Sequence, residues 1–231
     1  MQLSARGKFR CTMRSLAEHH DDPGGEGMDV SRVLATLRIG NKALGFVGGF
    51  AGEELEGRLL NEGIKSGFTR ISGETRTNII VNEMHNSLQT VFSARGLEIS
   101  PLEFIQLIHK LEKLAQPDMV IISGSLPPGV HPAIYRKIVE MAKIRGARVL
   151  LDTDDDALKT GIQGLPDVIK PNLYEMSRLV GTELKVIDEI ISAVRNVHEE
   201  GVEIVLVSMG GTGNFRWEKK SNIWLLPLLW R

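Results

Sequence analysis

The sequence has little cysteine and no excess of charge, and each shortage excludes a class of protein. Cys11 is the single cysteine among 231 residues, and one thiol can form neither a disulfide framework nor a zinc site. The formal net charge is −1, with Lys and Arg scattered along the chain. This balance excludes a global field that would recruit nucleic acid or an acidic membrane. We therefore expect small-molecule ligands and no nucleic-acid partner.

Long apolar runs are missing as well. The longest strongly apolar stretch near the end, residues 223–230, contains Pro227. It is far shorter than the ~20 residues that a bilayer-spanning helix needs. Residues 1–8 are not followed by the apolar segment of a secretory signal. Because scarce cysteine also suits a reducing compartment, these absences predict a soluble cytoplasmic protein with no membrane partner.

Apolar runs and helical patterns alternate from about residue 30 onward, in a chain long enough for one sizeable α/β domain. The spacing predicts helices over residues 30–37, 53–62, 102–114, 132–144 and 189–199, with another beginning near Ala157. Buried strands are expected over residues 43–48, 119–122, 149–151, 168–169 and 204–207. Strands that alternate with helices predict a mainly parallel sheet.

Residues 67–96 have a different texture. Residues 68–71, 77–81 and 88–92 are short, alternate roughly between apolar and polar side chains, and are separated by polar turns. This pattern predicts a small antiparallel sheet rather than strand–helix units. We expect this segment to form a lid or a dimerisation sheet at one edge of the domain.

Ligands of parallel α/β sheets bind outside the carboxyl ends of the strands, and two glycine-rich segments are candidates for this region. Residues 23–27 precede the first helix, where glycines let a ligand approach and unpaired N–H groups attract an anion. Residues 45–52 contain four glycines around the end of a strand. An ordinary turn remains the commoner interpretation of the first segment, and close packing is an equal alternative for the second.

Two further segments follow buried strands directly. Residues 122–129 bring Ser123 and Ser125 together with two prolines, so hydroxyl groups on a rigid loop can donate to a sugar or phosphate. Residues 207–213 form a small, glycine-rich turn whose N–H groups can lie against nucleotide phosphates.

The segment at residues 170–175 places Asn172 and Glu175 one helical turn apart. An oxygen pair of this kind suits Mg²⁺, which keeps several waters and takes few protein ligands. The alternative is a helix that begins with an Asn cap and a Glu at its third position, which is equally sound physically.

Taken together in this order, the five segments resemble the PfkB family of ribokinase-like sugar kinases, in its phosphofructokinase and tagatose-6-phosphate kinase branch. The run at residues 123–129 and the helix beginning at residues 30–34 are the most specific pieces, and the resemblance covers about residues 21–213. It implies a single kinase domain over residues 1–231, incomplete at its carboxyl end. The implied fold is a three-layer α/β sandwich with a mainly parallel sheet and a small antiparallel β lid over about residues 67–96.

The resemblance also implies a reaction and the residues that serve it: transfer of the γ-phosphoryl group of ATP to a ketose phosphate, with Mg²⁺. The implied substrate-binding residues are Gly24, Gly25, Gly27, Asp29, Gly48, Gly49, Arg76 and Ser125. The implied nucleotide-binding residues are Lys170, Asn172, Ser208, Gly210 and Gly213, and the implied metal-binding residues are Asn172 and Glu175. Arg76 would grip the sugar phosphate with its guanidinium fork. A homodimer through the lid is a further implication.

The sequence departs from the family pattern in three places. Residues 1–20 lack the expected first strand ending in Asn-Pro, and Asp29 stands where the family usually has Asn. No Gly-Ala-Gly-Asp motif, which carries the catalytic base, occurs before Arg231, and residues 219–231 are unlike the family. Because a general base contributes typically 10²–10⁴-fold, we expect weak or absent kinase activity. Loss of the final layer of the fold would also expose apolar sheet edge and face, so we expect marginal stability or aggregation.

Three alternatives remain in view. One is a non-catalytic remnant that binds a sugar phosphate or a nucleotide. A dinucleotide-dependent oxidoreductase is disfavoured, since no Gly-x-Gly-x-x-Gly motif follows a first strand. A metal site at residues 19–22 or 152–156 is also disfavoured, because the first is an irregular polar segment and the second starts a helix that acidic residues stabilise.

Overall fold

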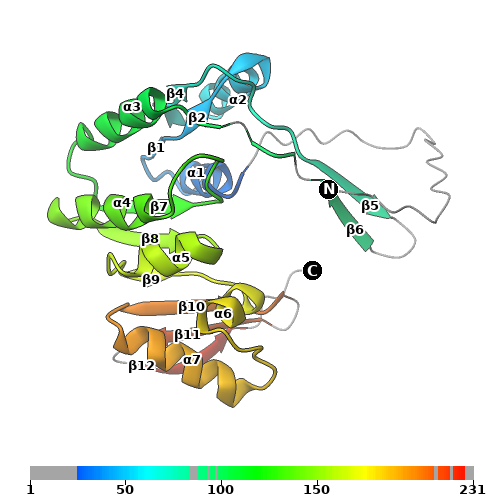
Figure 1. Cartoon of the computed structure of the whole chain (residues 1–231), viewed down its shortest axis with the longest axis vertical. Coiled ribbons are helices and arrows are strands. Elements are labelled where there is room, and N and C mark those ends of the chain that lie inside the picture. Colours follow the sequence, from blue (N-terminus) through cyan, green and yellow to red (C-terminus); the bar gives the residue numbers. More distant parts are fainter. Residues whose placement is uncertain are drawn as a thin grey trace.

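A six-stranded sheet in the order β12-β11-β10-β9-β8-β7 forms the centre of the computed structural model (Figure 1). The structure describes residues 25–83, 88–92, 94–96, 98–210, 213–218 and 221–226. The parallel strands are β7 (Met119–Ser123), β8 (Arg148–Asp152), β9 (Val168–Ile169) and β10 (Ile204–Ser208). Two antiparallel strands, β11 (Asn214–Glu218) and β12 (Ser221–Leu226), extend the sheet. The predicted mainly parallel sheet is confirmed.

Helices connect the parallel strands, as expected. The helices are α1 (Glu26–Thr36), α2 (Gly49–Asn61), α3 (Pro101–Glu112), α4 (Ala133–Ile144), α5 (Asp155–Ile162), α6 (Leu173–Val180) and α7 (Ile187–Glu199). Each predicted helix is confirmed, although α2 begins at Gly49 and so starts before the expected residue 53. The helix α6 is the one that the Asn-cap alternative for residues 170–175 implied.

The two faces of the sheet differ in how they are covered. Successive side chains of a strand point to opposite faces. The strand register places one set of side chains on a single face of the sheet, where they pack with α4, α5 and α7 in the main core. This set is Val120, Ile122, Val149, Leu151, Ile169, Val205, Val207, Phe215 and Trp217. We call the opposite face the second face. Of its apolar residues, Val168 is buried, whereas Ile121, Leu150, Ile204 and Leu206 are only partly buried.

The segment expected as one strand at residues 43–48 is divided in two. β1 (Lys42–Ala43) pairs in parallel with β3 (Lys65–Ser66), and β2 (Phe46–Val47) pairs in parallel with β4 (Thr69–Arg70). A second core cluster lies between these strands and α2, and it consists of Ala43, Val47, Leu55, Leu59, Ile64 and Phe68.

The prediction that residues 68–71 belong to the antiparallel lid is wrong. Phe68 and Thr69 are buried, and the Ile71 N–H donates to the Val47 carbonyl at 2.9 Å. The apolar side chain of Phe68 stabilises the second core cluster, so this segment pairs with β2 instead of forming part of a hairpin.

The expected antiparallel sheet is present in the remainder of that segment. β5 (Ile79–Glu83) and β6 (Leu88–Phe92) form an antiparallel hairpin with Ile79 opposite Phe92. Figure 1 shows this hairpin projecting away from the central sheet. Its described apolar side chains Ile79, Val81 and Phe92 are exposed, so the hairpin has an uncovered apolar surface.

Candidate functional site

The predicted site residues of the second half of the chain lie at the carboxyl ends of β7 to β10. Ser123 is the register partner of Asp152, and a bridge joins Asn172 to Ser208. Lys170 follows β9, and its ammonium nitrogen lies 3.0 Å from Oδ2 of Asp152. The strand order therefore brings four separate chain segments together at one edge of the sheet.

Residues 123–125, which we call the serine turn, leave the end of β7. Gly124 has a φ of +94°, a left-handed value that favours glycine, and its N–H donates to the Asp152 carbonyl at 3.0 Å. The Gly124 carbonyl accepts two hydrogen bonds, from the hydroxyls of Tyr135 and Thr153, both at 2.9 Å. The buried Ser123 hydroxyl has no hydrogen-bond partner among the described residues.

Arg76 reaches the serine turn from the base of the hairpin. Its guanidinium donates to Oγ of Ser125 at 3.2 Å. A Cβ atom placed on Gly96, on the returning side of the hairpin, would lie 3.9 Å from the Arg76 side chain and 3.6 Å from Pro128. The structure thus joins two residues predicted to bind the sugar phosphate, although 49 positions separate them in the sequence.

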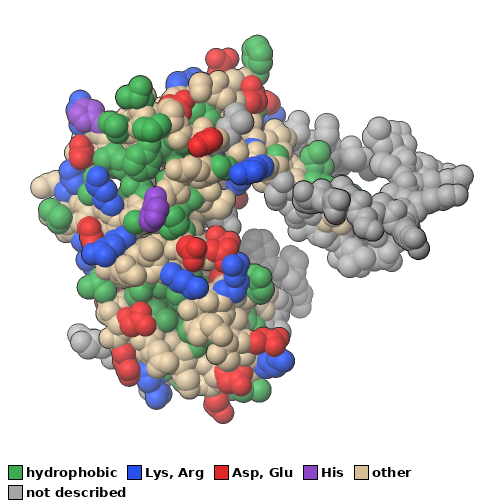
Figure 2. Space-filling model, viewed as in Figure 1, with side chains coloured by type: hydrophobic (Ala, Val, Ile, Leu, Met, Phe, Trp, Pro, Cys, Tyr) green, Lys and Arg blue, Asp and Glu red, His purple; other side chains and the backbone are tan. Residues whose placement is uncertain are grey.

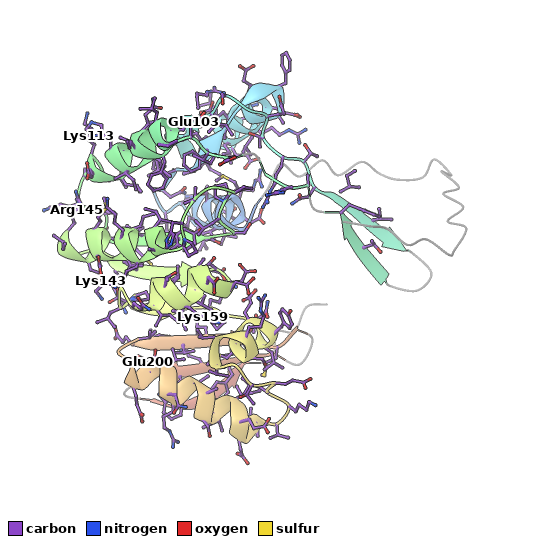
Figure 3. The ribbon with its side chains drawn as sticks, viewed as in Figure 1. Glu103, Lys113, Lys143, Arg145, Lys159 and Glu200 are labelled. Carbon is purple, nitrogen blue, oxygen red and sulfur yellow. The ribbon has the colours of Figure 1, made fainter. Side chains whose placement is uncertain are left out.

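The loop that leads to Arg76 is anchored by Glu103, labelled at the start of α3 in Figure 3. The Glu103 carboxylate accepts hydrogen bonds from the N–H of Ser72 at 2.6 Å and from the N–H and hydroxyl of Ser100 at 2.8 and 2.7 Å. The bonds from Ser100, followed by that from Ser72, lower the pKa of Glu103 to about 2. Sequence analysis missed this anchor, although the Ser100–Glu103 spacing is that of a capping box.

Gly48 and Gly49 lie against the same loop. A Cβ atom on Gly48 would overlap the Gly73 carbonyl, and one on Gly49 would overlap the Glu74 carboxylate. That carboxylate accepts a hydrogen bond from the Ala51 N–H at 2.8 Å, so it occupies the positive amino end of α2. The structure supports close packing, the alternative to substrate contact for these two glycines, and it gives them the loop before Arg76 as their neighbour.

The amino end of α1 lies over the second face. A Cβ atom on Gly27 would lie 4.0 Å from that of Ser123, whereas no atom of the described residues lies within 4 Å of a Cβ on Gly25. Asp29 is exposed and lies 3.3 Å from Arg32, whose guanidinium also pairs with Glu62 at 2.7 Å, so two carboxylates share one cation. The i,i+3 spacing of Asp29 and Arg32 was a signal that sequence analysis missed. Gly24 lies outside the described residues, as do residues 19–22.

Asn172 and Glu175 form the capping box of α6. The Asn172 N–H donates to Oε2 of Glu175 at 2.8 Å, and the Glu175 N–H donates to Oδ1 of Asn172 at 2.9 Å. Burial raises the pKa of Glu175, and the nearby Asp152 and Asp154 carboxylates act in the same direction. The capping alternative is confirmed.

Mg²⁺ is compatible with this capping box, since the ion commonly binds through waters and substrate phosphates with only one or two carboxylates. In the part of the chain that the structure describes, no group of three or more acidic, His or Cys side chains could hold a metal ion by itself. The concentration of carboxylates around Glu175 nevertheless favours a cation. The residues present therefore fit a hydrated Mg²⁺ that a nucleotide brings with it.

The glycine-rich turn after β10 is tied to the capping box. The Ser208 N–H donates to the Pro171 carbonyl at 3.0 Å, and Met209 and Gly213 close the turn with a 2.8 Å hydrogen bond. Gly210 has a φ of +58°, and among the described residues no atom lies within 4 Å of a Cβ at that position. The predicted nucleotide-binding residues thus form one cluster.

The acidic segment after β8 starts a helix, as expected. Asp155 and Asp156 lie in the first turn of α5, where carboxylates stabilise the helix dipole. Asp155 has a φ of +50° and pairs with Arg178, whose guanidinium also lies 5.6 Å from the centre of the Tyr174 ring.

Figure 2 shows basic and acidic side chains interspersed over the viewed face, without a large area of one sign. Among the described helices, none has the length and apolar character needed to cross a bilayer.

Comparison with known proteins gives consistent results. The profile of the pfkB family carbohydrate kinases matches residues 5–224. This range extends past the expected resemblance at both ends. It includes residues 219–224, which we had expected to be unlike the family. The 1-phosphofructokinase of Bacillus subtilis is 35% identical over 191 residues, which is 83% of this chain and 62% of the relative. That of Borreliella burgdorferi is 34% identical, over 82% of this chain and 61% of the relative.

Solved structures agree with this assignment. Phosphofructokinase-2 from Escherichia coli, in complex with fructose-6-phosphate, superimposes with a TM-score of 0.82 at 29% identity and covers 88% of this chain and 68% of that chain. The chain thus spans just over three fifths of the length of the curated relatives it matches. On the family profile, the sequence identity and the shared ribokinase-like fold, the chain belongs to the pfkB family of carbohydrate kinases.

Proposed function

We propose that this chain binds a ketose phosphate and MgATP side by side at the carboxyl edge of its sheet, for transfer of the γ-phosphoryl group to a sugar hydroxyl. The observation that carries the proposal is the joining of two predicted groups at this edge. Arg76 and Ser125 form one group, and Lys170, Asn172 and Ser208 belong to the other. At the end of β8, Asp152 and Thr153 contact Gly124, the neighbour of Ser125, and Asp152 also pairs with Lys170.

The sugar phosphate is assigned to the serine turn and Arg76. A guanidinium presents several N–H donors in a planar fork that matches phosphate oxygens. The Ser125 hydroxyl accepts from Arg76 and keeps its own proton for a ligand. Gly25 and Gly27 border the same region at the start of α1, and the lack of a side chain at each would let a sugar approach the backbone.

The nucleotide is assigned to the cluster around the capping box of α6. Lys170 forms an ion pair with Asp152, but its side chain is still 45% exposed. Its ammonium group can therefore also contact a phosphate. Glu175 and Asn172 would orient the waters of Mg²⁺, which when bound neutralises charge on the transferred phosphoryl group. Gly210 would let the phosphates approach the backbone of the turn.

Fructose 1-phosphate is the substrate we propose first. The curated relatives compared above are named 1-phosphofructokinases, and the solved relative contains fructose 6-phosphate. Both sugars carry the phosphate that the Arg76 group would recognise. Tagatose 6-phosphate belongs to the same chemical class and completes the set to be tested.

A second candidate function, binding of these ligands without turnover, is favoured by the state of two carboxylates. Asp29 and Asp152 could replace a general base, yet Asp29 is paired with Arg32 and Asp152 with Lys170. In each pair a cation already contacts the carboxylate and competes with a sugar hydroxyl for its oxygens. We therefore expect tight binding to be easier to detect than phosphoryl transfer.

The test measures ADP release from MgATP with each of the three sugar phosphates, and sugar binding by calorimetry. Arg76→Lys keeps the charge but removes the planar fork, and Arg58→Lys, on an exposed helix pair with Glu54, is the matched control. Loss of sugar binding in the first variant alone supports the proposed site. Absence of ADP release with intact binding of both ligands would favour the second candidate. A chain that binds neither ligand would overturn both.

We also propose that the hairpin forms a homodimer contact. Ile79, Val81 and Phe92 are exposed, and a two-stranded hairpin alone is marginally stable in water. Pairing two hairpins would cover both apolar surfaces. Light scattering over a concentration series would show a dimer that Ile79→Ser with Phe92→Ser dissociates, and a monomer at every concentration would contradict this contact.

A further inference from the structure

Two buried hydroxyl groups hold one peptide group of the serine turn. Tyr135 on α4 and Thr153 after β8 are 8% and 5% exposed. Both donate to the Gly124 carbonyl, each at 2.9 Å. A carbonyl oxygen has two lone pairs, so both are used. The peptide between Gly124 and Ser125 cannot rotate without breaking both hydrogen bonds.

This restraint fixes the direction of the next N–H group. The Gly124–Ser125 peptide is trans, as are the peptides of the chain generally, and C=O and N–H point in opposite directions across a planar trans peptide. Since the carbonyl points at two buried side chains, the Ser125 N–H points away from the core. No described residue accepts a hydrogen bond from it.

The N–H of Ser125 therefore joins two other donors at the same place. The Ser125 hydroxyl accepts from Arg76 at 3.2 Å and can donate its own proton outward. Backbone N–H, hydroxyl and guanidinium together make a set of donors suited to the oxygens of a phosphate.

We propose that Tyr135 and Thr153 are positioning residues for the sugar phosphate: their hydroxyls fix the Gly124–Ser125 peptide so that the Ser125 N–H and hydroxyl converge with Arg76 on its phosphate group. This inference rests on the proposed function. It adds two buried residues from outside the glycine-rich and serine motifs. It also explains why a tyrosine and a threonine from different elements share one acceptor.

The experiment removes each hydroxyl with little change of shape, through Tyr135→Phe and Thr153→Val. Thr36→Val is the matched control, because the Thr36 hydroxyl also donates to a backbone carbonyl, that of Arg32 at 3.0 Å, but lies at the end of α1. Amide hydrogen exchange is measured at Gly124, whose N–H donates to the Asp152 carbonyl. Affinities are measured for fructose 1-phosphate, fructose 6-phosphate, inorganic phosphate and a non-hydrolysable ATP analogue.

We expect both variants to speed exchange at Gly124 and to weaken sugar-phosphate binding by about three- to tenfold each, the range for loss of one hydrogen bond. Affinity for the ATP analogue should stay unchanged, and Thr153→Ser, which keeps the hydroxyl, should restore sugar-phosphate binding. A merely structural role would not separate the two ligands in this way.

The outcomes distinguish this inference from the function on which it rests. Unchanged exchange at Gly124, or faster exchange with unchanged sugar-phosphate affinity, would overturn the positioning role and leave the proposed function standing. A wild-type chain that binds no sugar phosphate and no inorganic phosphate would overturn the proposed function, and the positioning role with it.

Discussion

The ammonium group of Lys170 lies 3.0 Å from the carboxylate of Asp152, and this ion pair joins the ends of two neighbouring strands. The backbone carbonyl of Asp152 also accepts the Gly124 N–H, while the next residue, Thr153, donates to the Gly124 carbonyl. The end of β8 thus connects the serine turn to the cluster assigned to the nucleotide. Both proposed ligands depend on the geometry of this one strand end.

Replacing Lys170 and replacing Asp152 should shift the pH midpoint of Mg²⁺-dependent nucleotide binding in opposite directions. Burial and the Asp152 carboxylate raise the pKa of Glu175, and the Lys170 ammonium group offsets part of this rise. Its ionised form is the one that favours a cation, so binding is lost as pH falls through that pKa. Lys170→Met should shift the midpoint to higher pH and Asp152→Asn to lower pH. Calorimetric titration with MgATP across pH 4–8 checks this, and shifts of the same sign would contradict it.

Glu103→Gln should remove a source of acid sensitivity. Hydrogen bonds from Ser100 and Ser72 lower the pKa of Glu103 to about 2, below the ordinary 4.5. For a carboxyl group with a lowered pKa, stability is present above 4.5 and is lost as the pH falls from there towards 2. The melting temperature of the wild type should therefore fall more steeply below pH 4.5 than that of the variant. Glu53→Gln on α2 is the control, and identical slopes in all three chains would exclude this role.

Asp155→Gly should give a more stable chain than Asp155→Ala. Both variants lose the pair with Arg178, so its contribution cancels when the two are compared. Only glycine tolerates the φ of +50° at this position without strain, a difference of about 1–2 kcal/mol. Urea unfolding of the two variants measures the difference directly. Equal midpoints would mean that the backbone at residue 155 is not held in the left-handed region.

A charged side chain should destabilise the chain strongly at one residue of β10 and only slightly at its neighbour. Val205 is fully buried in the main core, whereas Leu206 points to the second face and is only partly buried. Val205→Lys should destabilise the chain by several kcal/mol, because an unpaired charge would be buried. Leu206→Lys should cost less than about 1 kcal/mol and should reduce binding of a hydrophobic dye. Thermal unfolding and dye fluorescence test both, and equal destabilisation would show that the second face is covered.

The sequence by itself determined most elements of the fold and which segments lie at the carboxyl edge of its sheet. Periodicity located the helices and the parallel strands because apolar side chains repeat with the spacing of a buried face. Motifs at strand ends could be placed together because the carboxyl ends of parallel strands share one edge. The sequence was ambiguous for Asn172 and Glu175, since a helix cap and a Mg²⁺ site use the same residue types at the same spacing.

Tertiary structure decided the contacts between segments distant in sequence. Phe68 and Thr69 alternate like a hairpin strand, but burial against β2 determined their pairing. Gly48 and Gly49 face the loop of Gly73 and Glu74, which local pattern cannot reveal. No sequence pattern indicated a role for Tyr135 or Thr153, because a tyrosine on the buried face of a helix and a threonine after a strand are both common. Only the fold brings their hydroxyls to one carbonyl oxygen, since hydrogen-bond partners depend on distance in space and not on separation along the chain.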